Sequence, residues 1–333
     1  MARQPLKTYL CLFAQQHPEF RLPELLSLAS VTKSEVKFDE LSYSKTNPLL
    51  LVHFPSEESA CRIAARSLLI RSLFELWGSG RNHDELEASV NKLPSEFTDR
   101  YRRSDYTFKV VVRGFSRKCS AEKQLQLYER LSYLPLAGKV NLSNPDYEFH
   151  LLEDYGDNPN EAPMEPHRVF VGRLISHGQR HLIQKYAVKN RHFIGNTSMD
   201  AQLSLIMANM AQVKEGSLVF DPFVGTGSLL VAGAHFGGFG MGADIDYPLI
   251  HGRGRASRAG AESKWRGKDE NVSSNLRQYG LADRYLDVLV ADAAKNVWRQ
   301  GELFDAIITD PPYGIREGRR KIWVKKYTKP SPT

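Results

Sequence analysis

The sequence has little cysteine and no long hydrophobic run. Its three cysteines, Cys11, Cys61 and Cys119, are far apart and odd in number. They provide neither a disulfide framework nor the paired spacing of a zinc site, which indicates a reducing compartment. No apolar segment approaches the roughly 20 residues that a transmembrane helix needs, and the first residues lack the apolar core and cleavage site of a secretory signal. We therefore expect a cytoplasmic protein without a membrane partner.

Acidic residues are absent from one stretch and crowded into another. The formal net charge is +7, and the last segment, residues 316–333, is strongly basic. Residues 97–118 carry seven Lys/Arg against two acids, and residues 167–192 carry six Lys/Arg and no acid. Between them, residues 146–166 carry seven acids and no Lys or Arg. Two basic patches around an acidic loop favour a surface for a polyanion, with solvated charged faces as the alternative.

Apolar patterning divides the chain into two parts. Before residue 176 we predict strands and helices in mixed order, which is typical of an α+β region. The strands are 47–55, 107–115, 139–154 and 167–175, of which 139–154 is broken by an Asn-Pro turn, and the helices are 58–78 and 121–134. After residue 192 the pattern changes to strand–turn–helix units, with a helix at 195–216 and strands at 217–221, 240–246, 285–292 and 304–310. We predict an α+β region (1–175), a basic linker (176–192), an α/β Rossmann-like domain (193–315) and a basic tail (316–333).

Each of the four strands predicted in the second part ends in an aspartate. In an open α/β sheet the ligand lies beyond the carboxyl ends of the strands, so we expect these carboxylates to line one crevice.

The segment DPFVGTGS, residues 221–228, joins the first of these strands to a helix. Gly225 and Gly227 allow a tight turn and close approach of a ligand. The third glycine of a dinucleotide-binding GxGxxG loop is missing, because Leu230 stands there. Asp221, four residues before the first glycine, suits a ligand with a cationic amine. This pattern favours S-adenosylmethionine over NAD, and an ordinary turn is the alternative.

Two further carboxylates fit the same cofactor. Asp244 stands where an acid accepts hydrogen bonds from both ribose hydroxyls, and Ile245 beside it offers an apolar face to adenine. Asp292 is placed to accept a hydrogen bond from the adenine amino group.

The motif DPPY, residues 310–313, predicts a grip for a planar amine held in line with a methyl donor. Asp310 can accept one N–H of an exocyclic amine. Because Pro311 and Pro312 have a fixed φ and no N–H, a backbone carbonyl there is presented rigidly to the second N–H. Tyr313 offers a ring to a base that has left its stack, a contact worth about 1–3 kcal/mol in single strands. A strand-ending turn is the alternative.

These motifs carry a resemblance. The order GNTSMD, DPFVGTGS, GADID, VADAA and DPPYG is similar to that of amino-directed methyltransferases of the class-I Rossmann fold. The segments KVNLSNPDYEFHLLEDYG and VFVGRLI are similar to a THUMP domain, a tRNA-binding module. Together they resemble the catalytic subunits of eukaryotic tRNA guanosine-10 N2-methyltransferases over about residues 1–317.

The resemblance implies a substrate, a cofactor and a partner. The methyl donor would be S-adenosylmethionine, and the target the exocyclic N2 of guanosine-10 in tRNA. The partner would be a small zinc-binding activator subunit that pairs with the catalytic one. By position, the cofactor would meet Thr197, Asp221, Gly225, Gly227, Asp244 and Asp292, and the target amine would meet Asp310 and the turn Pro311, Pro312, Tyr313.

The chain departs from this family near residue 316. A sheet of this class has seven strands with the fourth in the centre, and the polar segment 316–333 cannot supply three buried strands. We therefore expect a C-terminally incomplete fold with only the first four strands, in which the fourth is an exposed edge and the edge at 285–290 still binds the activator.

Two alternatives to this enzyme stay open. One is a catalytically dead protein that binds tRNA or sequesters the activator. The other is a DNA amino-methyltransferase, because DPPY also serves adenine and cytosine amines, although the THUMP-like segment argues against it.

Overall fold

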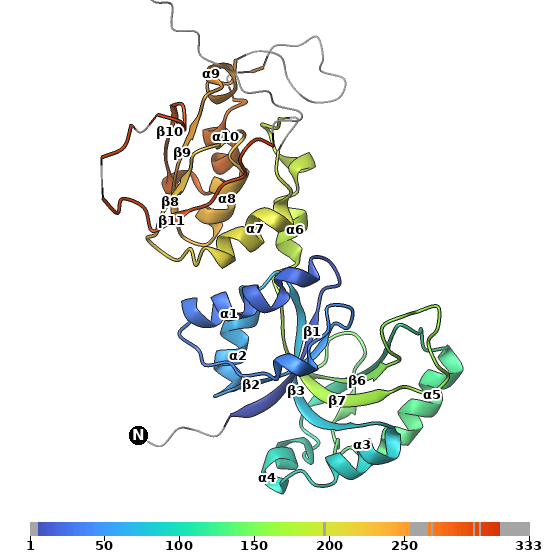
Figure 1. Ribbon diagram of the computed structural model, residues 1–333. Helices are drawn as coiled ribbons and strands as arrows, with labels where there is room; N and C mark the ends of the chain where they lie inside the picture. The colour runs from blue at the N-terminus through green and yellow to red at the C-terminus, as the bar shows by residue number, and fades with distance from the viewer. Residues whose placement is uncertain are drawn as a thin grey trace, which may run out of the picture. The chain divides into compact units, whose positions relative to one another are not determined.

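The computed structural model describes residues 6–195, 198–253, 266–267, 269–295, 297–299 and 301–313. The chain forms two compact units (Figure 1). The first comprises Met1–Asn190 and Ala201–Lys214, and the second Arg191–Asp200 and Glu215–Thr333. Among the described residues, no helix has the length and hydropathy that a membrane span requires.

A seven-stranded mixed sheet forms the first unit, in the order β2-β1-β3-β7-β6-β4-β5. β4 is parallel to both β5 and β6, and the other pairs are antiparallel. The strands are β1 (Lys7–Phe13), β2 (Leu49–Phe54), β3 (Ile70–Gly80), β4 (Thr107–Phe115), β5 (Lys139–Val140), β6 (Tyr147–Asp154) and β7 (Arg168–His177).

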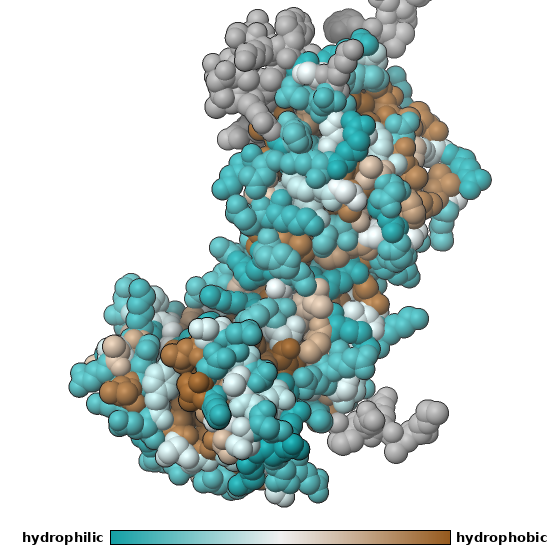
Figure 2. All heavy atoms as spheres, turned by 180° about the vertical axis from the view of Figure 1, so that it is seen from behind, coloured by the Kyte–Doolittle hydropathy of each residue, from teal (hydrophilic) through white to brown (hydrophobic). Residues whose placement is uncertain are grey.

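Helices cover one face of this sheet. Leu86 and Val90 of α3 and Leu127 of α5 pack against Trp77 and Phe149 of the sheet. The other face keeps half-buried leucines over a smaller apolar cluster, and apolar surface is visible there from behind (Figure 2). The helices of this unit are α1 (Arg21–Val31), α2 (Glu57–Ala64), α3 (His83–Val90), α4 (Ser95–Thr98), α5 (Ala121–Arg130), α6 (His181–Lys185) and α7 (Ala201–Met210).

The prediction of one long helix over 58–78 is wrong, because the chain changes from helix α2 to strand β3 within it. The Glu24 carboxylate accepts hydrogen bonds from the N–H groups of Leu68 and Leu69, each at 3.0 Å, and Ser67 Oγ accepts that of Ile70 at 2.8 Å. These N–H groups would point to carbonyls one turn back in a continuing helix. A carboxylate from α1 therefore ends the helix, and Glu24 is remote in sequence.

Helix α7 packs within the first unit, although its sequence follows the linker. Ser27 Oγ of α1 donates to the Asn209 carbonyl at 2.7 Å, and Asn209 Nδ2 donates to Glu24 Oε1 at 2.8 Å. The buried Asn209 side chain thereby satisfies part of the Glu24 network.

The second unit contains a parallel four-stranded sheet in the order β10-β9-β8-β11. Its strands are β8 (Leu218–Asp221), β9 (Phe239–Asp244), β10 (Tyr285–Val290) and β11 (Ala306–Ile307), and its helices are α8 (Ser228–His235), α9 (Tyr247–Ile250) and α10 (Val272–Gln278). The four predicted strands are thus confirmed, with β11 much shorter than expected. Within the described residues β11 pairs with β8 alone, and Ile307 is 64% exposed.

Candidate active site

Four aspartates lie at one edge of the parallel sheet, as the sequence predicts. Asp221 and Asp244 end β8 and β9, whereas Asp292 and Asp310 follow the ends of β10 and β11. Because the strands are parallel, their carboxyl ends share one edge. The N–H of Ala291 donates to the Asp244 carbonyl at 3.0 Å, which ties the ends of β10 and β9 together.

Asp221 is the most buried of these acids, with 2% of its surface exposed. Its Oδ1 accepts hydrogen bonds from the Phe223 N–H at 3.0 Å and from Thr309 Oγ1 at 2.8 Å. Burial, together with the negative charges of Asp244 and Asp310, raises the pKa of Asp221 to about 6. A buried carboxylate among other carboxylates is a favourable place for a cation.

The glycine loop between β8 and α8 is tied to Asp244. Asp244 Oδ2 accepts the N–H of Gly225 at 3.0 Å, and Oδ1 accepts that of Asp246 at 2.9 Å. Gly225 and Gly227 have φ angles of 49° and 79°, which a residue with a side chain rarely adopts. A Cβ on Gly225 would meet nothing nearer than 4.0 Å, so there is open space beside the loop for a ligand.

Asp292 borders an apolar cleft of about 370 Å³. Pro222, Ala243, Ala291 and Trp298 are among the residues that line it. The Trp298 ring packs edge-on against Phe220, with 4.8 Å between the ring centroids. Asp292 is held by its own turn, because its Oδ1 accepts the N–H of Ala294 at 3.0 Å.

The DPPY turn extends beyond β11. Tyr313 is 79% exposed, and its hydroxyl donates a hydrogen bond to Asp310 Oδ1. Pro311 and Pro312 separate the two residues and are exposed. The motif therefore presents an aromatic ring and a carboxylate together at the open edge of the sheet. The remaining predicted residue, Thr197, lies outside the described residues.

Sequence reasoning missed four polar side chains of this site. Thr309 bonds to Asp221, Ser198 Oγ lies 2.7 Å from Thr226 Oγ1, and Asn275 of α10 is fully buried beside the glycine loop. Thr309 adjoins the DPPY motif and was the easiest to find. The one weak sign in the sequence that Asn275 has a special role is that asparagine is a poor helix former, yet it lies within a helix.

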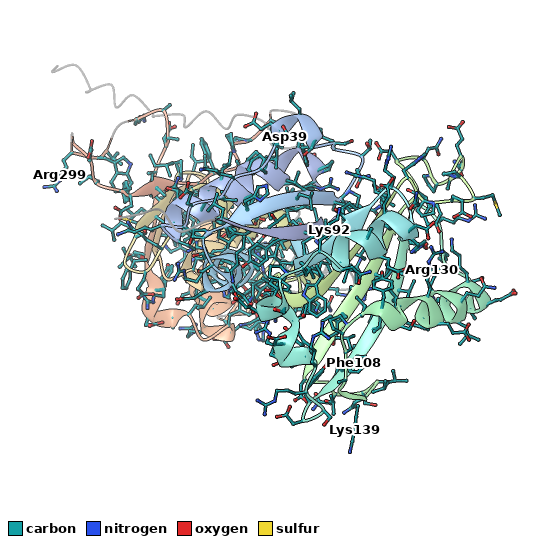
Figure 3. The ribbon with its side chains drawn as sticks, turned by 90° about the horizontal axis from the view of Figure 1, so that it is seen from below. Asp39, Lys92, Phe108, Arg130, Lys139 and Arg299 are labelled. Carbon is teal, nitrogen blue, oxygen red and sulfur yellow. The ribbon has the colours of Figure 1, made fainter. Side chains whose placement is uncertain are left out.

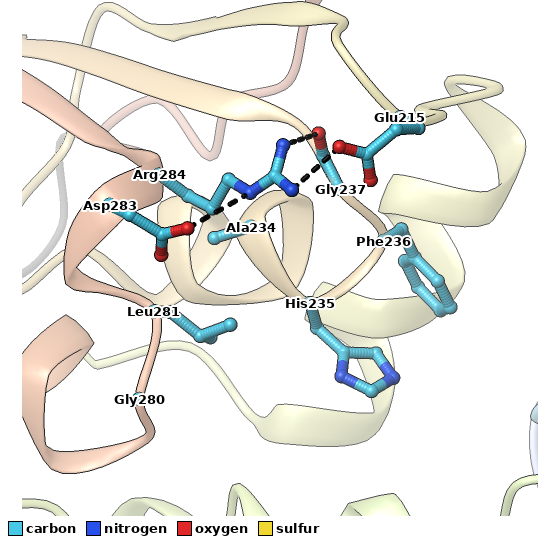
Figure 4. Close-up of a pocket in the computed structure, with 9 residues that line it drawn as sticks. All are labelled: Glu215, Ala234, His235, Phe236, Gly237, Gly280, Leu281, Asp283 and Arg284. Atoms are coloured by element: carbon cyan, nitrogen blue, oxygen red, sulfur yellow. Dashed lines mark hydrogen bonds and ion pairs between the residues drawn. The ribbon is translucent and has the colours of Figure 1, made fainter.

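A second cleft, of about 430 Å³, lies at the opposite ends of the strands (Figure 4). Arg284 organises it: Nη2 pairs with Glu215 Oε1 at 2.6 Å, and Nη1 donates to the Gly237 carbonyl at 3.1 Å. These residues precede β10, β8 and β9, respectively. The cleft contains none of the predicted site residues, so we assign Arg284 the structural task of tying three strand entrances together.

The basic segments of the first unit present fewer open charges than their sequence indicates. Arg173 is buried and pairs with Glu75 at 3.0 Å, and Lys109 pairs with Glu148 at 2.8 Å. Outside these segments, Lys139 at the start of β5 points away from the ribbon (Figure 3).

The charge of Arg71 acts on two other arginines of the first unit, Arg113 and Arg180. Burial, reinforced by the charge of Arg71, lowers the pKa of both Arg113 and Arg180. Like charges held near each other favour an anionic ligand.

A four-stranded parallel sheet with a glycine loop after its first strand in sequence and DPPY after its fourth defines a Rossmann-like methyltransferase domain. Residues 189–329 match the family described as "RMKL-like, methyltransferase domain", and residues 7–180 match "Tmrp11 THUMP N-terminal domain". The match to the methyltransferase domain extends past residue 316, to residue 329. The domain boundaries drawn from the sequence stay predictions.

The chain belongs to the tRNA (guanine(10)-N(2))-methyltransferase family. It is 52% identical to the mouse protein named tRNA (guanine(10)-N(2))-methyltransferase TRMT11, over 96% of this chain and 69% of that protein. The human protein of that name is 50% identical over the same shares. The Saccharomyces cerevisiae tRNA (guanine(10)-N(2))-methyltransferase is 34% identical over 96% of this chain and 71% of that protein. The chain therefore consists of an N-terminal THUMP domain followed by a Rossmann-like methyltransferase domain.

Proposed function

We propose that this chain transfers a methyl group from S-adenosylmethionine to the exocyclic N2 of guanosine-10 in tRNA. The observation that carries the proposal is the convergence of Asp221, Asp244 and Asp310 at one sheet edge beside the glycine loop, in a chain of this family. The donor supplies a methyl group on a positively charged sulfur. The attacking N2 forms a bond to that methyl, the carbon–sulfur electron pair stays on sulfur, and one N2 proton passes to solvent.

The residues at the sheet edge fit this cofactor. Asp221, with its pKa raised to about 6, would accept the cationic amine of the methionyl part. The open space beside Gly225 would admit the chain that carries it. Each Asp244 oxygen accepts a single backbone N–H and keeps a lone pair for a ribose hydroxyl.

The adenine would lie in the apolar cleft. Ile245, 36% exposed, flanks Asp244, and Asp292 stands at the rim of the cleft with one oxygen bonded to its own turn. The second oxygen would accept a hydrogen bond from the adenine amino group.

The DPPY turn would hold the target base. Asp310 would accept one N–H of the guanine amine. In the structure the Tyr313 hydroxyl donates to Asp310 Oδ1, and the amine would take the place of this hydroxyl. The exposed Tyr313 ring would stack on the flipped-out base. Holding the amine in one orientation is the main contribution of these residues, since the reaction needs the nitrogen in line with the methyl–sulfur bond.

The first unit would bind the tRNA, with Arg71, Arg113 and Arg180 near phosphates. Electrostatic contacts to phosphates make affinity fall steeply with salt. Replacing the three arginines by glutamine should lower the slope of log affinity against log salt by about 2–3. A slope equal to that of the unchanged chain would remove these residues from the tRNA surface.

The edge strand β10 would bind the small zinc-binding activator subunit. Leu286, Leu289 and Val290 are 49%, 36% and 45% exposed, and within the described residues β10 pairs with β9 alone. An apolar edge strand is a template for another chain. Loss of co-purification on changing Leu286 and Val290 to lysine would support this site, and undiminished association would exclude it.

We also propose a cytoplasmic location, consistent with three cysteines that are free thiols. Fractionation of cells that express a tagged chain would test it.

The decisive experiment is methyl transfer from labelled S-adenosylmethionine to unmodified tRNA, in the presence of the activator. A matched tRNA with adenosine at position 10 is the control, and duplex DNA tests the other amine substrates. Label in the guanosine-10 tRNA alone would support the proposal. Label in DNA would make the chain a DNA amino-methyltransferase, and tRNA binding without label would leave it a binding protein.

A further inference from the structure

The glycine loop is held by a side chain that the proposed chemistry does not use. Asn275 of α10 has no exposed surface. Its Nδ2 donates to the Thr226 carbonyl at 3.1 Å and to the Phe193 carbonyl at 2.8 Å, and its Oδ1 accepts the Phe193 N–H at 3.0 Å. One planar amide therefore binds both backbone groups of Phe193 and the middle residue of the loop.

Other contacts hold the loop from strand β9, from Ser198 and from helix α10. Asp244 binds the N–H of Gly225, and Ser198 Oγ lies 2.7 Å from Thr226 Oγ1. A Cβ on Gly227 would lie 2.5 Å from Val272 Cγ1 of α10, so the loop and this helix are in close contact. Among the described residues, Asn275 is the side chain that donates a hydrogen bond to the Thr226 carbonyl.

This bond matters because the loop is rich in glycine. Glycine has more conformational freedom to lose than any other residue, so the loop depends on external contacts for one conformation. When a binding site is populated only part of the time, its apparent affinity falls by that fraction. A contact that fixes the loop without touching the ligand thus raises affinity by pre-organisation.

We propose that Asn275 is a positioning residue that fixes the glycine loop in its cofactor-binding conformation. The inference rests on the proposed function, since it takes the loop to be the cofactor site. It requires no contact between Asn275 and the cofactor.

The test is calorimetric titration of the full chain with S-adenosylhomocysteine, with thermal unfolding measured on the same samples. Asn275→Ala removes all three hydrogen bonds, and Asn275→Asp keeps the acceptor for Phe193 while removing both donors. The matched control is Leu276→Ala, which creates a cavity at the neighbouring, fully buried position of α10. We expect both Asn275 variants to raise Kd at least tenfold. Leu276→Ala should lower Tm at least as much as either and keep Kd within threefold.

Methyl-transfer kinetics supply a readout that a merely structural role would not move selectively. In the Asn275 variants KM for S-adenosylmethionine should rise, while KM for tRNA stays unchanged. Two results would overturn the inference. One is a rise in Kd that is proportional to the fall in Tm in all three variants, Leu276→Ala included. The other is an Asn275→Asp chain that binds S-adenosylhomocysteine as tightly as the unchanged chain. Failure of the unchanged chain to bind S-adenosylhomocysteine would instead overturn the proposed function.

Discussion

Two buried carboxylates, Glu153 in the seven-stranded sheet and Asp221 in the four-stranded sheet, are almost equally hidden and differently surrounded. They are 0% and 2% exposed. Glu153 Oε1 lies 2.9 Å from His83 Nε2, and its Oε2 accepts the Tyr155 hydroxyl at 2.8 Å. Burial alone would raise the pKa of Glu153, but these hydrogen bonds and the charge of Lys123 lower it below its usual value.

Asp221 also accepts two hydrogen bonds, from Thr309 and Phe223, and these lower its pKa, but no cation among the described residues adds to them. Burial comes first among the causes that raise its pKa, and the charges that act on it, those of Asp244 and Asp310, raise it further. Both acids are buried, yet among the residues that the structure describes only Glu153 has a cation in its surroundings. Burial alone therefore does not mark a functional acid. A buried acid with no counter-charge among the described residues is the better candidate, because a cationic ligand can relieve the cost of burying its charge.

The largest expected effect is on an acid of the same sheet edge that is only half-buried. Asp310→Ala should lower the rate of methyl transfer about 1,000-fold, because loss of an oriented partner in the transition state costs roughly 4 kcal/mol. Binding of S-adenosylhomocysteine and Tm should stay close to those of the unchanged chain. Single-turnover transfer with labelled donor measures the rate. A loss below tenfold would mean that DPPY does not grip the amine.

Asp221→Asn should weaken S-adenosylhomocysteine binding about 100-fold while it stabilises the free protein. A pKa raised from 3.8 to about 6 means that the ionised Asp221 lowers the free energy of unfolding by roughly 3 kcal/mol above that pH. The isosteric amide carries no charge and should recover about 1 kcal/mol of this stability. Urea unfolding at pH 8 and calorimetric titration measure the two effects. If Asp221→Asn destabilised the protein instead, Asp221 would be a structural acid like Glu153.

Glu153→Gln should have the opposite effect on stability. Removing the charge weakens two hydrogen bonds and leaves Lys123 without its acid, so we expect a loss of about 2 kcal/mol in urea unfolding at pH 8. Glu129→Gln on α5, an exposed position, is the control and should change stability by less than about 0.5 kcal/mol. Equal effects of the two changes would contradict a structural role for Glu153.

The same two acids should give opposite pH dependence. The pKa of Asp221 is raised from 3.8, so its contribution to stability is complete below pH 3.8 and is lost as the pH rises through about 6. The lowered pKa of Glu153 gives stability that is present above pH 4.5 and lost as the pH falls through its folded value. Because the ionised Asp221 would bind the cation, and the ionised fraction of a group with a pKa of about 6 rises from about 0.09 at pH 5 to about 0.5 at pH 6, S-adenosylhomocysteine should bind about fivefold tighter at pH 6 than at pH 5. Asp221→Asn should remove this dependence.

The sequence predicts all four strands of the second unit, whereas in the seven-stranded sheet it predicts β2, β4, β5, β6 and β7 and misses β1 and β3. Buried parallel strands are short apolar runs, and each here is followed by a polar motif that marks its end. In the first unit, the end of α2 depends on Glu24, whose carboxylate captures the N–H groups of Leu68 and Leu69. Apolar spacing over 58–78 contains no trace of that contact, so the spacing alone predicts a longer helix.

The candidate site divides in the same way. Asp221 and Asp244 end their strands and Asp310 follows one, and their position at one edge is a consequence of the parallel topology. The environment of Asp221 could not be predicted, because it depends on Thr309 Oγ1 and on the degree of burial. The role of Asn275 could not be predicted for a related reason: its partners, Phe193 and Thr226, come from two other segments of the chain.

The smallest expected effect concerns the hydroxyl of Tyr313. Its hydrogen bond to Asp310 raises the pKa of Tyr313, so at neutral pH the phenol is protonated and donates to that carboxylate. Tyr313→Phe removes this competitor and keeps the ring, so methyl transfer should change less than threefold. Tyr313→Ala, the matched contrast, also removes the stacking surface and should raise KM for tRNA about tenfold. If Phe were as damaging as Ala, the hydroxyl rather than the ring would hold the base, and Asp310 would need Tyr313 as a partner in the way that Glu153 needs Tyr155.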